Sequence, residues 1–159
     1  MNALRSVFVA GPFKALVDTA SGELDPLHKA RMLRLIDFFE QRGVAVHNAH
    51  RREAWGKEFL APEECTRIDF DEIRDADLFV ALPGFPASPG THVEIGWASA
   101  MGKPAVLLLE QGREYAFLVR GLPAVAPAIL VRFAHDDDLL DGLEAALAVL
   151  LPGLVARTG

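Results

Sequence analysis

The chain has 159 residues, of which 51% are hydrophobic and 24% are charged, and it carries a formal net charge of −6. This balance is typical of one globular domain spanning 1–159, and it excludes a disordered tail or a fibrous repeat. Binding of nucleic acid polymers or anionic membranes requires clustered Lys and Arg, so this acidic chain is expected to bind neither. A small anionic substrate remains possible where positive side chains gather locally.

Five apolar runs alternate with amphipathic stretches along the chain. The runs are typical of buried strands: Ser6–Ala10, Val44–His47, Leu78–Leu82, Ala105–Leu109 and Ala128–Phe133. The amphipathic stretches predict helices at 26–42, about Pro62–Arg74, Thr91–Met101 and Asp136–Leu150. Strands that alternate with helices form a parallel sheet covered on both faces. The sequence therefore predicts an α/β fold, a single doubly wound, flavodoxin-like sheet of five parallel strands in the order 2-1-3-4-5.

The first helix has clear boundary signals. Asp25 is a typical N-cap, Pro26 suits the first helical position, and Gly43 suits the C-terminal end. Apolar residues at helical spacing are expected to form its buried face: Leu27, Ala30, Leu33, Ile36 and Phe39.

Ligands of doubly wound sheets bind beyond the carboxyl ends of the strands, at the point where the strand order reverses. Three segments lie at that edge: Gly11–Lys14, His47–Arg52 and Pro83–Glu94. We therefore expect the chemistry-bearing side chains in these segments.

Several common motifs are missing from the sequence. There is no G-x-x-x-x-G-K-[ST], no G-x-G-x-x-G after the first strand and no G-x-S-x-G. His47 and His50 offer two imidazoles without a third ligand at suitable spacing, so neither a metal nor an organic cofactor is expected. The single cysteine, Cys65, excludes an intrachain disulfide. With no signal-peptide pattern and no apolar stretch near ~18 residues, the expected location is the cytoplasm.

The segment from Ser88 to Glu94 joins a Gly-rich loop to the start of a helix. Backbone N–H groups and the helix dipole at such a start can hold a phosphate, with the Ser88 hydroxyl as a further donor and Glu94 beside the same pocket. A structural alternative stays open, because Thr91-x-x-Glu94 is also the pattern of a capping box.

An acidic run at 67–77 precedes the third strand and contains a second candidate carboxylate. Such a run is usually a solvated helix face, and Asp77 is expected to be structural at the start of the strand. Asp69 shares a helix face with Ile73, so a buried Ile73 brings Asp69 toward the protein. Asp69 and Glu94, in different environments, can then provide one acid and one nucleophile.

Positive and polar side chains gather at 47–55 in an otherwise acidic chain. A solvated loop is one interpretation of this segment. In the functional interpretation, Arg51 and Arg52 bind a phosphate, and Asn48 or His50 reads a base edge.

Aromatic residues near the same edge allow stacking on a base. Phe13 and Lys14 follow the first strand, where the ring can stack and the ammonium can contact a phosphate. Trp55 can also stack on a base, although a core position is favoured. Trp97 and Phe117 are assigned to the core or to a subunit interface.

Three blocks carry a resemblance to a known family. They are V-F-V-A-G-P-F at 7–13, I-D-F-D-E-I-R-D-A-D-L-F-V-A at 68–81 and G-T-H-V-E-I-G-W-A-S-A-M-G-K-P-A-V-L-L-L at 90–109. Together they resemble the nucleoside 2-deoxyribosyltransferase family, from Val7 to about Phe133. Within it, H-N-A-H-R-R-E-A-W-G at 47–56 is similar to nucleoside 5′-monophosphate N-glycosidases, the CMP and hydroxymethyl-CMP hydrolases of cytosine-nucleoside antibiotic pathways such as that of mildiomycin.

The resemblance implies hydrolysis of the N-glycosidic bond of a pyrimidine ribonucleoside 5′-monophosphate to free base and ribose 5-phosphate. It implies that Glu94 is the nucleophile at the anomeric carbon and that Asp69 is the general acid for the departing base. It further implies that Gly11 and Phe13 line the sugar and base pocket.

The resemblance also implies a phosphate site and a partner subunit. Ser88, Gly90 and Thr91 would hold the 5′-phosphate. The enzyme would be a homodimer or larger, with Tyr115–Arg120 placed to complete the pocket of a neighbour. A relative offers a phosphate-binding serine near Ala116, so that contact is missing here.

Phe8 stands where deoxynucleotide hydrolases of this group carry a tyrosine, which favours a ribonucleotide. Two enzymatic alternatives remain: a 2-deoxyribosyltransferase that passes the sugar to a second base, and a 2′-deoxynucleoside 5′-monophosphate hydrolase. A phosphoribohydrolase that releases cytokinin bases fits less well. A nucleotide-binding sensor without chemistry is the alternative from another class.

Overall fold

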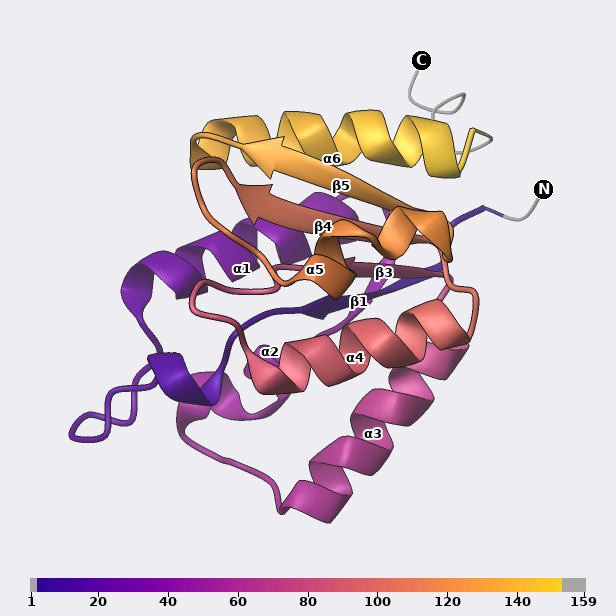
Figure 1. Cartoon of the computed structure of the whole chain (residues 1–159). Coiled ribbons are helices and arrows are strands. Elements are labelled where there is room, and N and C mark those ends of the chain that lie inside the picture. The colour runs from indigo at the N-terminus through magenta and orange to yellow at the C-terminus, as the bar shows by residue number, and fades with distance from the viewer. Residues whose placement is uncertain (1–2, 153–159) are drawn as a thin grey trace.

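The computed structural model describes residues 3–152 and contains one parallel sheet (Figure 1). The strand order is β2-β1-β3-β4-β5, and every neighbouring pair is parallel. The strands are β1 Ser6–Ala10, β2 Ala45–His47, β3 Leu78–Ala81, β4 Ala105–Glu110 and β5 Ala128–Phe133. The predicted fold class and strand order are confirmed.

Helices cover both faces of the sheet (Figure 1). On one face lie α1 Pro26–Glu40 and α6 Asp136–Leu150, and on the other lie α3 Pro62–Asp75, α4 Pro89–Ala100 and α5 Phe117–Arg120. The short α2 Ala49–Arg52 follows β2 directly, and three 3₁₀ turns lie at Lys14–Leu16, Ala54–Gly56 and Leu122–Ala124. The four long helices were predicted, whereas α2 and α5 were not.

Two hydrophobic clusters, one on each face, explain why the central strands are apolar throughout. In β1 the side chains of Val7 and Val9 enter the cluster under α1 and α6, while Phe8 and Ala10 enter the cluster under α3 and α4. This alternation is expected for a strand buried on both faces.

The buried face of α1 agrees with the predicted one only in its C-terminal half, where Ile36 and Phe39 are buried. Leu27 is 79% exposed and Leu33 is 38% exposed, and His28, Met32 and Leu35 are buried in their place. The start of the helix is as predicted, because Asp25 accepts a hydrogen bond from the backbone N–H of His28. Two overlapping sets of apolar residues fit helical spacing in α1. Packing against the sheet buries the set that includes His28.

The structural alternative of a capping box at Thr91 and Glu94 is excluded. Helix α4 begins two residues earlier, at Pro89, and Ser88 is its N-cap. Thr91 is therefore the third helical residue, and Glu94 lies in the second turn without a capping role. The local sequence contains two N-cap signals, and Ser88-Pro89 provides the one that is used.

Asp77 is structural, as predicted. Its carboxylate accepts hydrogen bonds from the backbone N–H groups of Arg5 and Ser6, at 2.9 and 3.2 Å. It therefore joins the entry of β3 to the entry of β1 at the amino edge of the sheet.

The segments that follow β1 and β3 touch at Gly84. Its φ is +90°, and an added Cβ would lie 2.6 Å from Cγ of Pro12. Only glycine fits this approach, which places the two loops of the strand-order switch point side by side.

We predict that Gly142→Ala lowers the free energy of unfolding by about 1–3 kcal/mol, because a Cβ in α6 would overlap the stiff side chain of Val131 on β5. Gly96→Ala is the matched control: it also replaces a helical glycine, but its Cβ would meet no atom within 4 Å. It should leave stability unchanged or raise it. Chemical denaturation measures both, and equal stability of Gly142→Ala and wild type would contradict the close packing of α6.

Candidate active site

A cavity of about 810 Å³ opens at the carboxyl edge of the sheet, between the loops that follow β1 and β3. Ten of the sequence-predicted site residues line it: Phe8, Gly11, Phe13, Lys14, His50, Asp69, Ser88, Gly90, Thr91 and Glu94. They come from β1 and its following loop, from α2, from α3 and from the start of α4. The fold thus brings together positions that are far apart in the sequence.

The N-terminus of α4 forms one wall of the cavity. Oγ of Ser88 accepts hydrogen bonds from the backbone N–H of Thr91 at 3.4 Å and from the Thr91 hydroxyl at 2.9 Å. A Cβ at Gly90 would meet no atom within 4 Å, so space is open beside the first turn. The first N–H groups of a twelve-residue helix therefore border a space that suits an anion.

Glu94 lines the cavity from the second turn of α4. Burial, together with the negative charge of Asp69, raises the pKa of its carboxyl to about 8, although the charge of Arg52 partly opposes the shift. The Glu94 carboxyl is consequently protonated at neutral pH.

Asp69 lines the cavity from α3, and the residue is only 9% exposed. Nη2 of Arg52 donates a hydrogen bond of 2.5 Å to its carboxylate. Burial raises the pKa of Asp69, while the hydrogen bond and the charge of Arg52 lower it. Because Asp69 has an ion-pair partner that Glu94 does not share, the first proton taken up by the two carboxyls resides on Glu94.

Stacked rings form the wall on the β1 side. Phe13 lies parallel to His50, with ring centroids 4.3 Å apart and an interplanar angle of 16°. Phe59 contacts Phe13 at 5.2 Å, and Nζ of Lys14 lies 5.0 Å above the Phe59 ring. Flat aromatic faces of this kind suit a planar heterocycle. Phe8, at the floor, is fully buried.

Three of the predicted site residues do not line the cavity. Nδ2 of Asn48 donates to the carbonyl of Val9 at 2.9 Å, and its Oδ1 caps α2 by accepting from the backbone N–H of Arg51. The guanidinium of Arg51 pairs with Glu40 at 2.7 Å on the exposed side of α2. Arg52 points toward α3, where it pairs with Asp69.

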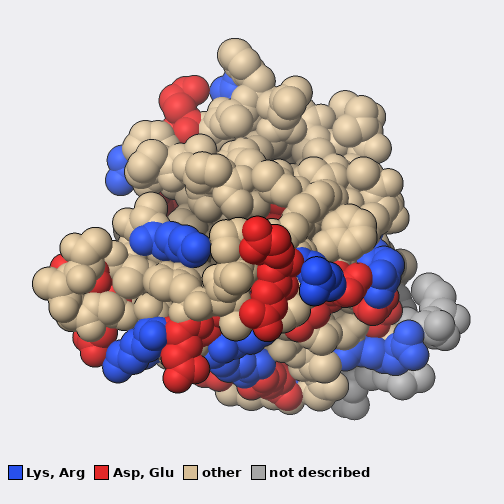
Figure 2. Space-filling model, turned by 90° about the horizontal axis from the view of Figure 1, so that it is seen from below, with Lys and Arg blue, Asp and Glu red and all other residues tan. Residues whose placement is uncertain are grey.

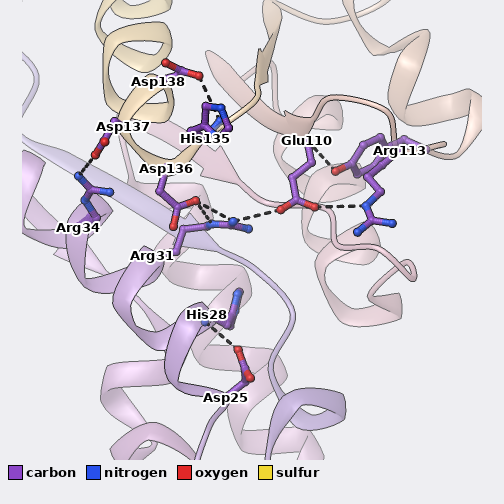
Figure 3. A network of polar contacts seen from close by, with 11 residues as sticks. Asp25, His28, Arg31, Arg34, Glu110, Arg113, His135, Asp136, Asp137 and Asp138 are labelled. Atoms are coloured by element: carbon purple, nitrogen blue, oxygen red, sulfur yellow. Dashed lines mark hydrogen bonds and ion pairs between the residues drawn. The ribbon is translucent and has the colours of Figure 1, made fainter.

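The far end of the cavity contains side chains that the sequence did not single out (Figure 3). Arg31 bridges Asp136 at 2.7 Å and Glu110 at 3.1 Å, which joins α1, α6 and the end of β4. His28 is 8% exposed and its Nε2 has no partner among the described residues. Burial lowers the pKa of His28 and keeps the imidazole neutral. No motif marks these residues, because they converge only through the packing of α1 against α6 and the ion pair from Arg31 to Glu110 at the end of β4.

Within residues 3–152, no three His, Cys, Asp or Glu side chains are grouped as metal ligands, and no helix is long and apolar enough to cross a membrane. Cys65 lines the cavity one helical turn before Asp69, and its Sγ lies 3.4 Å from the carbonyl of Pro62. In Figure 2, Lys and Arg alternate with Asp and Glu in the lower half of the view, and the upper half is nearly uncharged. This face therefore presents no extended basic patch for a nucleic acid polymer.

The model of one protein family matches residues 20–148, which is most of the chain; its description is nucleoside 2-deoxyribosyltransferase. The chain belongs to the nucleoside 2-deoxyribosyltransferase family. The cavity described above therefore lies in a fold that this family shares, at its carboxyl edge. Among curated protein sequences, no significant match was found.

Solved structures agree with the family. BlsM, determined in solution, is 52% identical with a TM-score of 0.82, and the match covers 95% of this chain and 94% of BlsM. The CMP N-glycosidase BcmB of Clostridium botulinum is 36% identical with a TM-score of 0.67, covering 88% of this chain and 99% of BcmB. A 2-deoxyribosyltransferase of Bacillus psychrosaccharolyticus, at 17% identity, TM-score 0.58 and coverage of 84% and 88%, shares the fold.

We predict that Glu94→Gln stabilises this family member at alkaline pH and not at acidic pH. The folded-state pKa of about 8 lies above the ordinary value of 4.5, so the stability that Glu94 contributes is fully present below pH 4.5 and is lost as the pH rises through 8. Glutamine resembles the protonated acid and does not ionise. The variant should exceed the wild type by about 1–3 kcal/mol near pH ~9 and match it near pH ~4. Unfolding measured at both pH values tests this, and a difference independent of pH would contradict it.

Proposed function

We propose that this protein hydrolyses the N-glycosidic bond of a pyrimidine ribonucleoside 5′-monophosphate, CMP or 5-hydroxymethyl-CMP, and releases the free base and ribose 5-phosphate. The observation that carries the proposal is the pair Glu94 and Asp69, two carboxyls in unequal environments that line one cavity beside a helix N-terminus. The choice of CMP draws on the likeness to the CMP N-glycosidase BcmB.

The 5′-phosphate is assigned to the start of α4. The backbone N–H of Gly90, the Ser88 hydroxyl and the open space at Gly90 together suit a dianion. Lys14, across the cavity, contributes a positive charge. With the phosphate at the first turn, the sugar lies next to Glu94 in the second turn.

The reaction proceeds through a covalent intermediate. The Glu94 carboxylate attacks C1′, the bond from C1′ to the base nitrogen breaks, and the base leaves with the electron pair and a proton from Asp69. A water molecule then attacks C1′ of the ester, releases ribose 5-phosphate and returns its proton to Asp69. Each transition state resembles an oxocarbenium ion, which a neighbouring carboxylate stabilises.

The proton shared by the two carboxyls changes places while positive charge develops on the sugar. Without substrate it resides on Glu94, because Arg52 favours the ionised form of Asp69. Positive charge that develops on the sugar ring lowers the pKa of the adjacent Glu94, so the proton moves toward Asp69 and the departing base. The pair with a single proton is therefore the active form, and activity should fall on both sides of neutral pH.

The base and the ribose are assigned to the opposite wall. The half-buried ring of Phe13, which stacks on the buried His50, offers a flat surface for a pyrimidine. Phe8 is buried at the cavity floor and has no hydroxyl, which supports the ribonucleotide over the deoxyribonucleotide.

We also propose that a second copy of the chain covers α5. Phe117 and Leu118 on this short helix are 82% and 87% exposed, and Val125 nearby is 83% exposed. Apolar side chains this exposed are typical of an interface. Since Tyr115 lines the cavity just before α5, a homodimer would place each neighbour beside the site.

We predict that Glu94→Ala abolishes release of cytosine from CMP while the protein stays folded, and that Asp69→Asn slows release by about 10²–10⁴-fold. Glu63→Ala, at the exposed start of α3, is the control that keeps activity. Chromatography of CMP, dCMP and cytidine incubated with each protein measures the free base.

The same panel separates the alternatives. Release from CMP and not from cytidine supports the phosphate assignment. Faster release from dCMP than from CMP would overturn the ribose assignment. Exchange of a deoxynucleoside base for an added base without phosphate would show a transferase, and binding of CMP without release would show a sensor.

We predict that Leu118→Glu converts the dimer to a monomer, because a charge replaces an apolar side chain at the interface. Val149→Glu is the matched control: Val149 is 72% exposed on α6, away from α5, and the variant should remain dimeric. Size-exclusion chromatography with light scattering measures the mass. A wild-type protein that elutes as a monomer would contradict the interface.

A further inference from the structure

Arg52 lies between two carboxylates rather than in the cavity. Its Nη2 donates to Asp69 at 2.5 Å, and its Nη1 donates to Glu72 at 2.8 Å. The side chain is 21% exposed, and Nε is buried without a partner among the described residues. Both outer nitrogens of the guanidinium therefore form ion pairs with carboxylates of α3.

We propose that Arg52 is a positioning residue: it fixes the Asp69 carboxylate against the cavity wall and determines which of the two cavity carboxyls carries the shared proton. This inference rests on the proposed function and assigns to Arg52 a role through Asp69 instead of a contact with the phosphate.

Helix α2, which carries Arg52, is held against the sheet by a hydrogen bond. Arg52 ends the single turn of α2, whose N-cap Asn48 donates a buried hydrogen bond of 2.9 Å to the carbonyl of Val9 in β1. The position of Asp69 relative to the switch point is thus set by a chain of contacts from β1 through α2 to α3. The planar guanidinium fork can hold both carboxylates at once, which a single ammonium group does less well.

The charged groups around Asp69 are otherwise negative. Glu72 lies one turn further along α3, Glu53 follows Arg52, and Glu94 faces Asp69 from α4. Nδ1 of His47, from β2, lies 3.4 Å from Oε1 of Glu72, the oxygen that does not pair with Arg52. Without Arg52, three carboxyl groups would face Asp69 with no cation in contact, so a proton would bind there more readily.

Arg52→Gln tests the proposal through the pH dependence of kcat/KM for CMP. Loss of the cation should move both limbs of the profile to higher pH, the acidic limb by about one unit or more. Arg52→Lys keeps the charge and should shift the profile less. Arg51→Gln is the matched control, because the neighbouring Arg51 pairs with Glu40 outside the cavity, and its profile should not move.

A second measurement does not depend on turnover. Carbon-13 NMR of the side-chain carboxyls, without nucleotide, should show the pKa of Asp69 raised by about one unit or more in folded Arg52→Gln. A profile and an Asp69 titration that both stay at wild-type values, or activity that falls equally at every pH, would overturn the proposal. If wild type releases no base from CMP while the titration still shifts, the proposed function fails and the electrostatic role of Arg52 stands.

Discussion

The burial of two carboxyls, Glu94 and Asp69, in one desolvated cavity is the constraint on which the site depends. Burial raises the pKa of both carboxyls, so their ionised forms cost stability, and Asp69 recovers part of that cost through its ion pair with Arg52. The pair persists because the sheet supplies enough apolar burial on both faces to hold α3 and α4 in place. Functional sites commonly lower the stability of a folded protein. Here the destabilising groups are the two buried carboxyls of Glu94 and Asp69.

The loops and caps serve the same geometry. Gly84 allows the loop after β3 to contact Pro12, and Ser88 starts α4 early enough to place Glu94 in the second turn. Lys103 donates to the carbonyls of Arg74 and Ala76 and so closes the C-terminal end of α3, the helix that carries Asp69. These contacts fix the ends of α3 and α4 and so the relative positions of Asp69 and Glu94.

Much of the fold could be predicted from the sequence, because strands buried on both faces are short apolar runs bounded by glycine, proline and charge. Asp69 was also placed correctly toward the protein, since Ile73 on the same helix face is fully buried. The buried stripe of α1 and the start of α4 were not, because each local pattern fits two registers and only tertiary packing selects one. The partner of Arg52 depends on how α2 packs against α3, and no spacing along the chain records that contact.

One thiol in the whole chain lies beside the reacting groups. Cys65 lines the cavity one turn before Asp69, and there is no other cysteine. A fluorine or spin label attached there would report from the rim of the site without any background signal, and no cysteine would first have to be removed by mutagenesis. Spectra of a label on Cys65 would therefore report how nucleotides enter and leave the cavity.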